Sequence, residues 1–66
     1  MTAEVKFLAY VVEAYKAAKG MSGREVFVLF ERTGALRYVL ASADALHTTG
    51  AEYTIGQIDD FIANHS

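Results

Sequence analysis

Ser22-Gly23-Arg24-Glu25-Val26-Phe27-Val28-Leu29-Phe30 is the stretch that decides between an all-helical fold and one with a buried strand. Its five consecutive apolar residues fit a short buried strand as well as a helix. The residues before them favour the helix, because Ser22 and Glu25 have the spacing of a capping box. There the serine side chain accepts the amide N–H of Glu25, and the glutamate carboxylate accepts the amide N–H of Ser22. We therefore predict a helix over about Gly23–Thr33.

This predicted helix carries more apolar residues than one buried face requires. Helical spacing places Val26, Leu29 and Phe30 on the inner face. Phe27 falls on a flank, and Val28 falls among charged residues on the outer side, where a polar residue is expected. The outer side is therefore a candidate contact surface.

Apolar residues at helical spacing also predict a helix from about Thr2 to Lys19. Its apolar arc is again wider than one core contact needs. Val5 and Val12 lie together on one flank of the inner face, and Tyr10 lies on the other. We add these three residues to Phe27 and Val28 as candidate interface residues.

Two further helical patterns follow Gly34, which is a stop signal. The third predicted helix covers about Ala35–Thr48, and Gly50 ends it. The last begins at Tyr53-Thr54, with Thr54 as its expected N-cap. Gly56 lowers helix stability there by about 1 kcal/mol relative to alanine, so the region Tyr53–Ile55 is either its first turn or a short extended segment.

These patterns predict an all-α fold, a small bundle of about four short helices in a single domain over residues 1–66. A chain of 66 residues without cysteine depends on packing or self-association, and 53% hydrophobic residues exceed what one small core can bury. The predicted core comprises Phe7, Leu8, Val11, Val26, Leu29, Phe30, Leu36, Val39, Leu40, Leu46, Ile58 and Ile62.

Composition excludes several classes of function. A net charge of −2 argues against a nucleic-acid-binding protein, which carries a surplus of lysine and arginine. No apolar run approaches the length of a membrane span, and the N-terminus lacks the pattern of a signal peptide. We expect a cytoplasmic bacterial protein. We expect neither a metal nor a cofactor, because His47 and His65 lie on different segments without a matching ligand set.

Leu46-His47-Thr48-Thr49-Gly50 is the stretch that looks most like a functional site. His47 follows Asp44 by about one turn, so it is either a histidine tuned by a carboxylate or a helix-end histidine bonded to free carbonyls. Thr48 and Thr49 either present hydroxyls to an anion or simply terminate the helix. Tyr53 is amphipathic and suits a groove or an interface.

The segments AYKAAKGMSGREV, LF…TG…YVL, ALHTTGAEYTI and IDDFI follow one another in this order over roughly residues 7 to 62. They give the chain a resemblance to a family of short bacterial proteins catalogued as domain of unknown function 3791. The resemblance implies a small stand-alone protein, often encoded beside a larger protein related to ADP-ribosyltransferases. The chain would then be an accessory or antitoxin-like partner of that protein.

Two classes of function follow from these observations. The first is a non-enzymatic protein-interaction module that binds a protein partner, a second copy of itself, or both. The second is a small enzyme component or ligand-binding protein that uses His47 and the LHTTG stretch. We favour the first, because 66 residues leave little room for both a core and a pocket. The surface around His47 distinguishes the two. An interaction module should show a broad apolar patch there or nearby, whereas an enzyme needs a concave polar pocket with convergent titratable groups.

Overall fold

The computed structural model describes residues 2–65 and the side chains of residues 2–64. Five helices follow one another along the chain: α1 (Ala3–Lys19), α2 (Gly23–Thr33), α3 (Ala35–Ala41), α4 (Ala43–Leu46) and α5 (Ala51–His65). No strand occurs in the described part of the chain. The prediction of a small all-α bundle is therefore confirmed. The side chain of His65, considered above as a metal ligand, lies outside the described residues.

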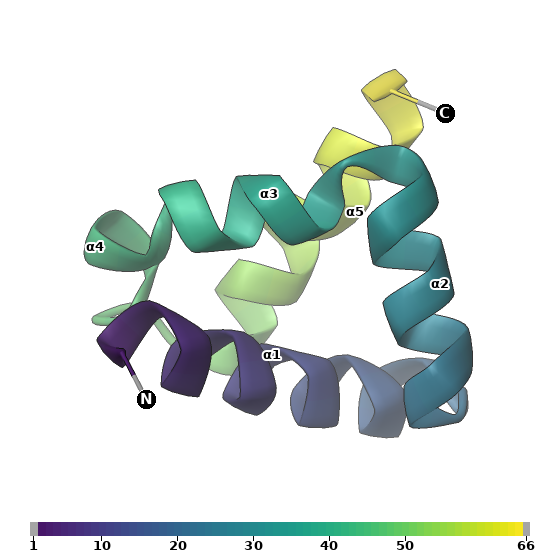
Figure 1. Cartoon of the computed structure of the whole chain (residues 1–66), viewed down its shortest axis with the longest axis horizontal. Coiled ribbons are helices and arrows are strands. Elements are labelled where there is room, and N and C mark those ends of the chain that lie inside the picture. Colours follow the sequence, from purple (N-terminus) through teal and green to yellow (C-terminus); the bar gives the residue numbers. More distant parts are fainter. Residues whose placement is uncertain (1, 66) are drawn as a thin grey trace.

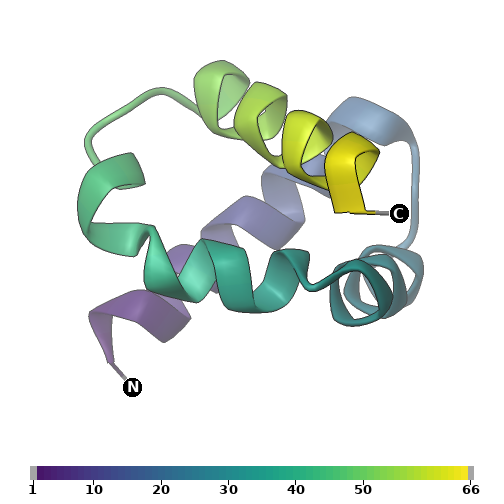
Figure 2. The ribbon, with the colours of Figure 1, turned by 90° about the horizontal axis from the view of Figure 1, so that it is seen from above.

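The first three helices form three sides of a frame. Figure 1 shows α1 along the bottom, α2 rising at the right edge and α3 returning along the top, with α4 at the left. Helix α5 crosses one face of this frame and packs against both α1 and α3. Figure 2, seen from above, shows α5 beside α3 and α2 at the end of the molecule away from α4. One side of α2 therefore faces away from the rest of the bundle.

The capping box at the start of α2 is present as the sequence predicted. The amide of Glu25 donates to Ser22 Oγ at 3.1 Å, and the amide of Ser22 donates to Glu25 Oε1 at 2.8 Å. The bond from the backbone of Ser22 lowers the pKa of the Glu25 carboxyl below its usual value. Gly34 ends the helix with φ of 84°, in the left-handed region that favours glycine. These signals decide for the helix over the strand.

One core joins all five helices. Its buried apolar residues are Phe7, Val11, Tyr15, Val26, Phe30, Ala35, Val39, Ala43, Leu46 and Ile58. Phe30 is one of its largest fully buried side chains, and its ring meets Tyr15 edge-on at a centroid distance of 5.2 Å. Five other residues of the predicted core are only partly buried, namely Leu8, Leu29, Leu36, Leu40 and Ile62. Ala35 and Thr54 are buried although the sequence analysis did not place them in the core.

The prediction of one continuous helix from Ala35 to Thr48 is wrong. Helix α3 ends at Ala41, and Ser42 leaves helical geometry with φ of −100° and ψ of 5° while its amide still donates to the Tyr38 carbonyl. The short helix α4 then starts in a new direction and ends at Leu46. Serine suits this position because its hydroxyl can hydrogen-bond to nearby backbone groups, which makes serine less favourable inside a helix. The bend lets α4 pack against α1, so that Leu46 is buried.

The extended segment considered near Tyr53–Ile55 is not formed, and Thr54 is not an N-cap. Helix α5 begins two residues earlier, at Ala51, and the amide of Thr54 donates to the Gly50 carbonyl at 3.1 Å. The side chain of Thr54 is 2% exposed and lies 3.1 Å from Thr49 Oγ1. Thr49 already donates its own proton to the Leu46 carbonyl at 2.7 Å, so the Thr54 hydroxyl is the donor to Thr49. The two threonines thus tie the end of α4 to α5.

Candidate functional site

Helix α2 exposes two large apolar side chains on the side that faces away from the bundle. Phe27 is 46% exposed and Val28 is 45% exposed, whereas Val26 and Phe30 on the inner side are fully buried. The sequence pattern had likewise placed Val26 and Phe30 on the inner face, and Phe27 and Val28 outside it. Scattered single apolar residues are normal on a surface, whereas α2 exposes two large ones at adjacent positions, which we call its apolar area.

Charged residues frame this apolar area. Arg24 and Glu31 stand one turn before Phe27 and one turn after it, and both are exposed. We call Arg24, Phe27, Val28 and Glu31 the outer face of α2. Beside it, a hollow of about 340 Å³ is lined by Met21, Arg24, Glu25, Val28, Leu29 and Arg32. The outer face and this hollow together give α2 a surface that is apolar at its centre and charged at its edges.

The other candidate interface residues lie on α1. Val5 and Tyr10 are exposed, at 39% and 52% respectively. Val12 differs from them, because it is half-buried and packs against the core. The apolar surplus of α1 is therefore smaller than the pattern indicated. Each of the two helices exposes two large apolar side chains, which stand five positions apart on α1 and next to each other on α2.

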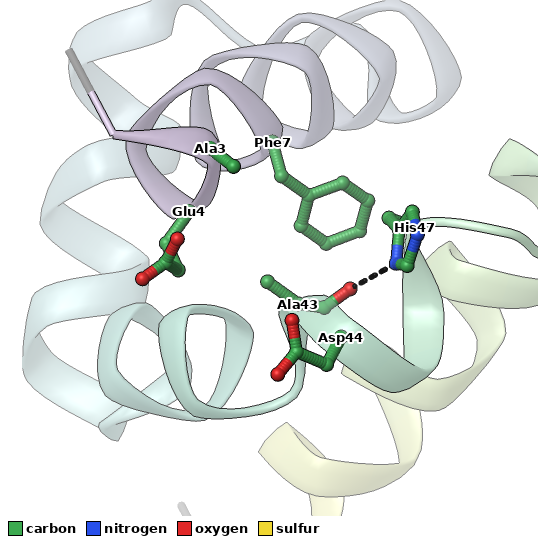
Figure 3. Close-up of a pocket in the computed structure, with 6 residues that line it drawn as sticks. All are labelled: Ala3, Glu4, Phe7, Ala43, Asp44 and His47. Carbon is green, nitrogen blue, oxygen red and sulfur yellow. Dashed lines mark hydrogen bonds between the residues drawn. The ribbon is translucent and has the colours of Figure 1, made fainter.

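His47 borders a shallow depression at the end of the molecule away from α2. About 180 Å³ in volume, it is lined by Ala3, Glu4, Phe7, Ala43, Asp44 and His47 (Figure 3). His47 Nδ1 lies 2.9 Å from the Ala43 carbonyl oxygen, so the ring donates to the first residue of α4, whose carbonyl also accepts the His47 amide. In Figure 3 the Asp44 carboxylate points away from the imidazole, and in the described residues no hydrogen bond or ion pair joins the two.

The depression is smaller than the 300–1,000 Å³ typical of ligand pockets. The hydrogen bond to Ala43 holds the imidazole against its own helix, but its acceptor is not one of the free carbonyls that a helix-end histidine was expected to bind. The large exposed apolar side chains of α2 lie elsewhere, so the surface at His47 is not the broad apolar patch expected of an interaction module either. Whether His47 has a function stays a prediction.

The remaining candidates of the LHTTG region separate into structural and exposed residues. Thr49 is half-buried and holds α4 to α5 through the bonds described above, whereas the side chain of Thr48 is exposed. Tyr53 is 56% exposed on the first turn of α5. The structure thus gives the Thr49 hydroxyl a role in the fold, and it leaves Thr48 and Tyr53 accessible to a partner.

A cluster that the sequence analysis missed joins α1 to α5. The Tyr15 hydroxyl donates to Asp59 Oδ1 at 2.7 Å, and Lys19 Nζ donates to Asp59 Oδ2 at 2.7 Å. Lys19 Nζ also lies 5.5 Å from the centre of the Tyr15 ring. Tyr15 and Asp59 are 44 positions apart in the sequence, so helical spacing within either segment could not pair them. Only the spacing of Tyr15 and Lys19, one turn apart, hinted at a shared partner.

The pKa values of this cluster are shifted in opposite directions. Burial, the hydrogen bond to Asp59 and the negative charge of Asp59 together raise the pKa of Tyr15 well above its usual value. Partial burial of Asp59 favours its neutral form, but the hydrogen bonds from Lys19 and Tyr15 outweigh this effect, and its pKa is lowered. At neutral pH the Tyr15 hydroxyl is therefore protonated and donates, while the Asp59 carboxylate is ionised and accepts. The carboxylate is occupied by two donors, so we assign the cluster to the fold rather than to chemistry.

Among the described residues, no group of three or more histidine, cysteine or acidic side chains could hold a metal ion. None of the helices in residues 2–65 combines the length and apolar character that crossing a membrane requires.

Comparison with known families gives one match. The family model described as "Protein of unknown function (DUF3791)" matches residues 6–65, which is nearly the whole chain. The chain belongs to this family. The resemblance drawn from the KGMSGREV and LHTTG segments is therefore confirmed, and both segments prove to hold helix ends in this DUF3791 member. We found no match to the chain among curated proteins or among solved structures.

Proposed function

We propose that the chain is a non-enzymatic protein-interaction module that binds its partner through the outer face of α2. The observation that carries this proposal is the pair Phe27 and Val28, each nearly half exposed on a helix whose inner face is already complete. Burying such a side chain against a partner contributes about 1.5–3 kcal/mol. Leaving both in water offers no gain to the folded monomer.

The partner that we propose is a protein, either a second copy of the chain or a larger neighbour related to ADP-ribosyltransferases. The second possibility rests on the family resemblance, which implies an accessory or antitoxin-like role beside such an enzyme. The exposure of Val5, Tyr10 and Tyr53 supports a protein partner as well, since it adds apolar surface outside α2. A bacterial cytoplasmic location belongs to the same proposal.

Calorimetric titration of the chain into the neighbouring ADP-ribosyltransferase-like protein tests this proposal. Contact through apolar surface predicts a negative heat-capacity change on binding. Phe27→Glu combined with Val28→Lys should abolish binding, because it places charges at the centre of the contact. His47→Gln and Thr48→Ala should leave the affinity unchanged.

The opposite pattern would favour the alternative function. If the two changes on α2 left binding intact while His47→Gln removed it at an unchanged melting temperature, the depression at His47 would be the functional site instead.

A further inference from the structure

The outer face of α2 has a pattern that reads the same in both directions along the helix, with charge reversed. Arg24, Phe27, Val28 and Glu31 follow one another at intervals of three, one and three residues, so they share one side of the helix. A cation stands at one end, an anion stands at the other, and two apolar residues lie between them. All four side chains are exposed.

We propose that this face is completed by a second copy of the chain, with the two α2 helices antiparallel about a two-fold axis between Phe27 and Val28. This inference rests on the proposed function and names the partner surface. In this register Phe27 faces the partner's Val28, and Arg24 faces the partner's Glu31. The two-fold axis repeats both contacts, as an isologous interface requires.

The charges select this register over one of its two neighbours. If the axis passed through Val28 itself, Arg24 would face the partner's Arg32, and Glu25 would face the partner's Glu31. Both pairs join like charges, which disfavour a complex strongly when they are brought together. With the axis between Phe27 and Val28, Arg24 faces the partner's Glu31 instead, and the pair of opposite charges is favourable.

The helix dipole supports the same arrangement. Arg24 lies in the first turn of α2 and Glu31 in its last turn, which is the unfavourable end of the helix for each charge. In an antiparallel pair, the beginning of one α2 lies beside the end of the other. Arg24 then approaches the negative end of the partner helix, and Glu31 approaches its positive end, so that both charges gain from the contact.

No internal contact has to be broken for this pairing. Within residues 2–65 the ion pairs are Lys16–Glu13 and Lys19–Asp59, and neither Arg24 nor Glu31 takes part in a hydrogen bond between side chains. Figure 1 shows α2 at the edge of the molecule, with its outer side clear of the other helices. A contact made by one helix of about 16 Å from each chain is small, so we expect a weak dimer that forms at tens to hundreds of micromolar chain.

Sedimentation velocity over a series of concentrations tests the pairing through a charge exchange. Arg24→Glu alone brings two carboxylates together, and Glu31→Arg alone brings two guanidinium groups together. Each should weaken the dimer by roughly tenfold or more. The double exchange, Arg24→Glu with Glu31→Arg, restores opposite charges and should recover the dimer. Lys6→Glu, which makes the same change of charge at an exposed position on α1, is the matched control and should leave the association nearly unchanged.

Folding effects are separable from association effects here. Both single variants place charges in favour of the dipole of their own helix, so the melting temperature at low concentration should stay the same or rise while the dimer weakens. Single variants that associate like the wild type, or a double exchange that stays monomeric, would overturn the pairing. A wild-type monomer at hundreds of micromolar would do so too, and binding of the neighbouring enzyme through Phe27 and Val28 would then show that the proposed function holds without it.

Discussion

The two sides of α2 carry the same kinds of side chain and have different surroundings. Val26 and Phe30 on the inner side are fully buried, while Val28 and Phe27 on the outer side are nearly half exposed. Residue type therefore does not decide which apolar residue belongs to the core; position around the helix does. The comparison separates residues that the fold requires from those that remain for a partner, and it extends to other residue pairs of the chain.

The phenylalanines should show the largest contrast. Phe30→Ala should lower the free energy of unfolding by about 3–5 kcal/mol, because it leaves a cavity in the core. Phe27→Ala should change it by no more than about 0.5 kcal/mol at a few micromolar chain, since its ring is outside the core. Urea unfolding followed by circular dichroism measures both. Equal losses for the two variants would break the distinction between the faces.

The acidic pair Asp59 and Asp60 extends the comparison to charge. The lowered pKa of Asp59 means that its stabilisation is complete above its unfolded value, about 3.9, and is lost as the pH falls through the lower folded value. Asp59→Asn should cost about 1–2 kcal/mol at pH 7, since the hydrogen bonds are to a charged but partly exposed group. In this variant the free energy of unfolding should also fall less steeply as the pH drops below about 4.

Asp60→Asn is the control for that experiment, because the Asp60 side chain is exposed and makes no ion pair in the described residues. Its unfolding free energy should follow that of the wild type at every pH. If the unfolding free energy of Asp59→Asn fell with pH as steeply as that of the wild type, the bonds of Asp59 to Tyr15 and Lys19 would not cause the loss of stability in acid.

The threonines should show a smaller contrast of the same kind. Thr54→Val removes the donor to Thr49 and should cost about 1 kcal/mol, the usual net contribution of one hydrogen bond. Thr48→Val changes an exposed hydroxyl and should stay within about 0.5 kcal/mol. Thermal unfolding compares them. A larger loss for Thr48 would mean that the LHTTG stretch contributes to the fold through a different residue.

Local signals made α2 predictable from the sequence. The capping box, Gly34 and the spacing of the apolar residues all concern neighbours within a few positions, so the pattern fixed both the helix and its two faces. The bend at Ser42 could not be found in this way, because Leu36, Val39, Ala43 and Leu46 keep helical spacing across it.

Contacts between distant segments were likewise beyond the sequence pattern. Tyr15 meets Asp59 across 44 positions, and the burial of Thr54 depends on how α5 packs across α1 and α3. Periodicity assigns each helix a face but does not tell which polar residue at its border finds a partner. For the candidate site this means that the exposed pair on α2 was predictable, whereas the sequence left a structural and a functional role of Thr49 and His47 both open.

The central claim is that the outer face of α2 serves contact and not folding. Light scattering after size exclusion, with the chain loaded at increasing concentration from tens of micromolar, tests it most directly on the wild type and on Phe27→Glu combined with Val28→Lys. We predict a mass that rises toward the dimer for the wild type, a monomer for the variant, and the same far-UV circular dichroism for both. A variant with the same mass as the wild type at every concentration, or one that loses its helical signal, would contradict the claim.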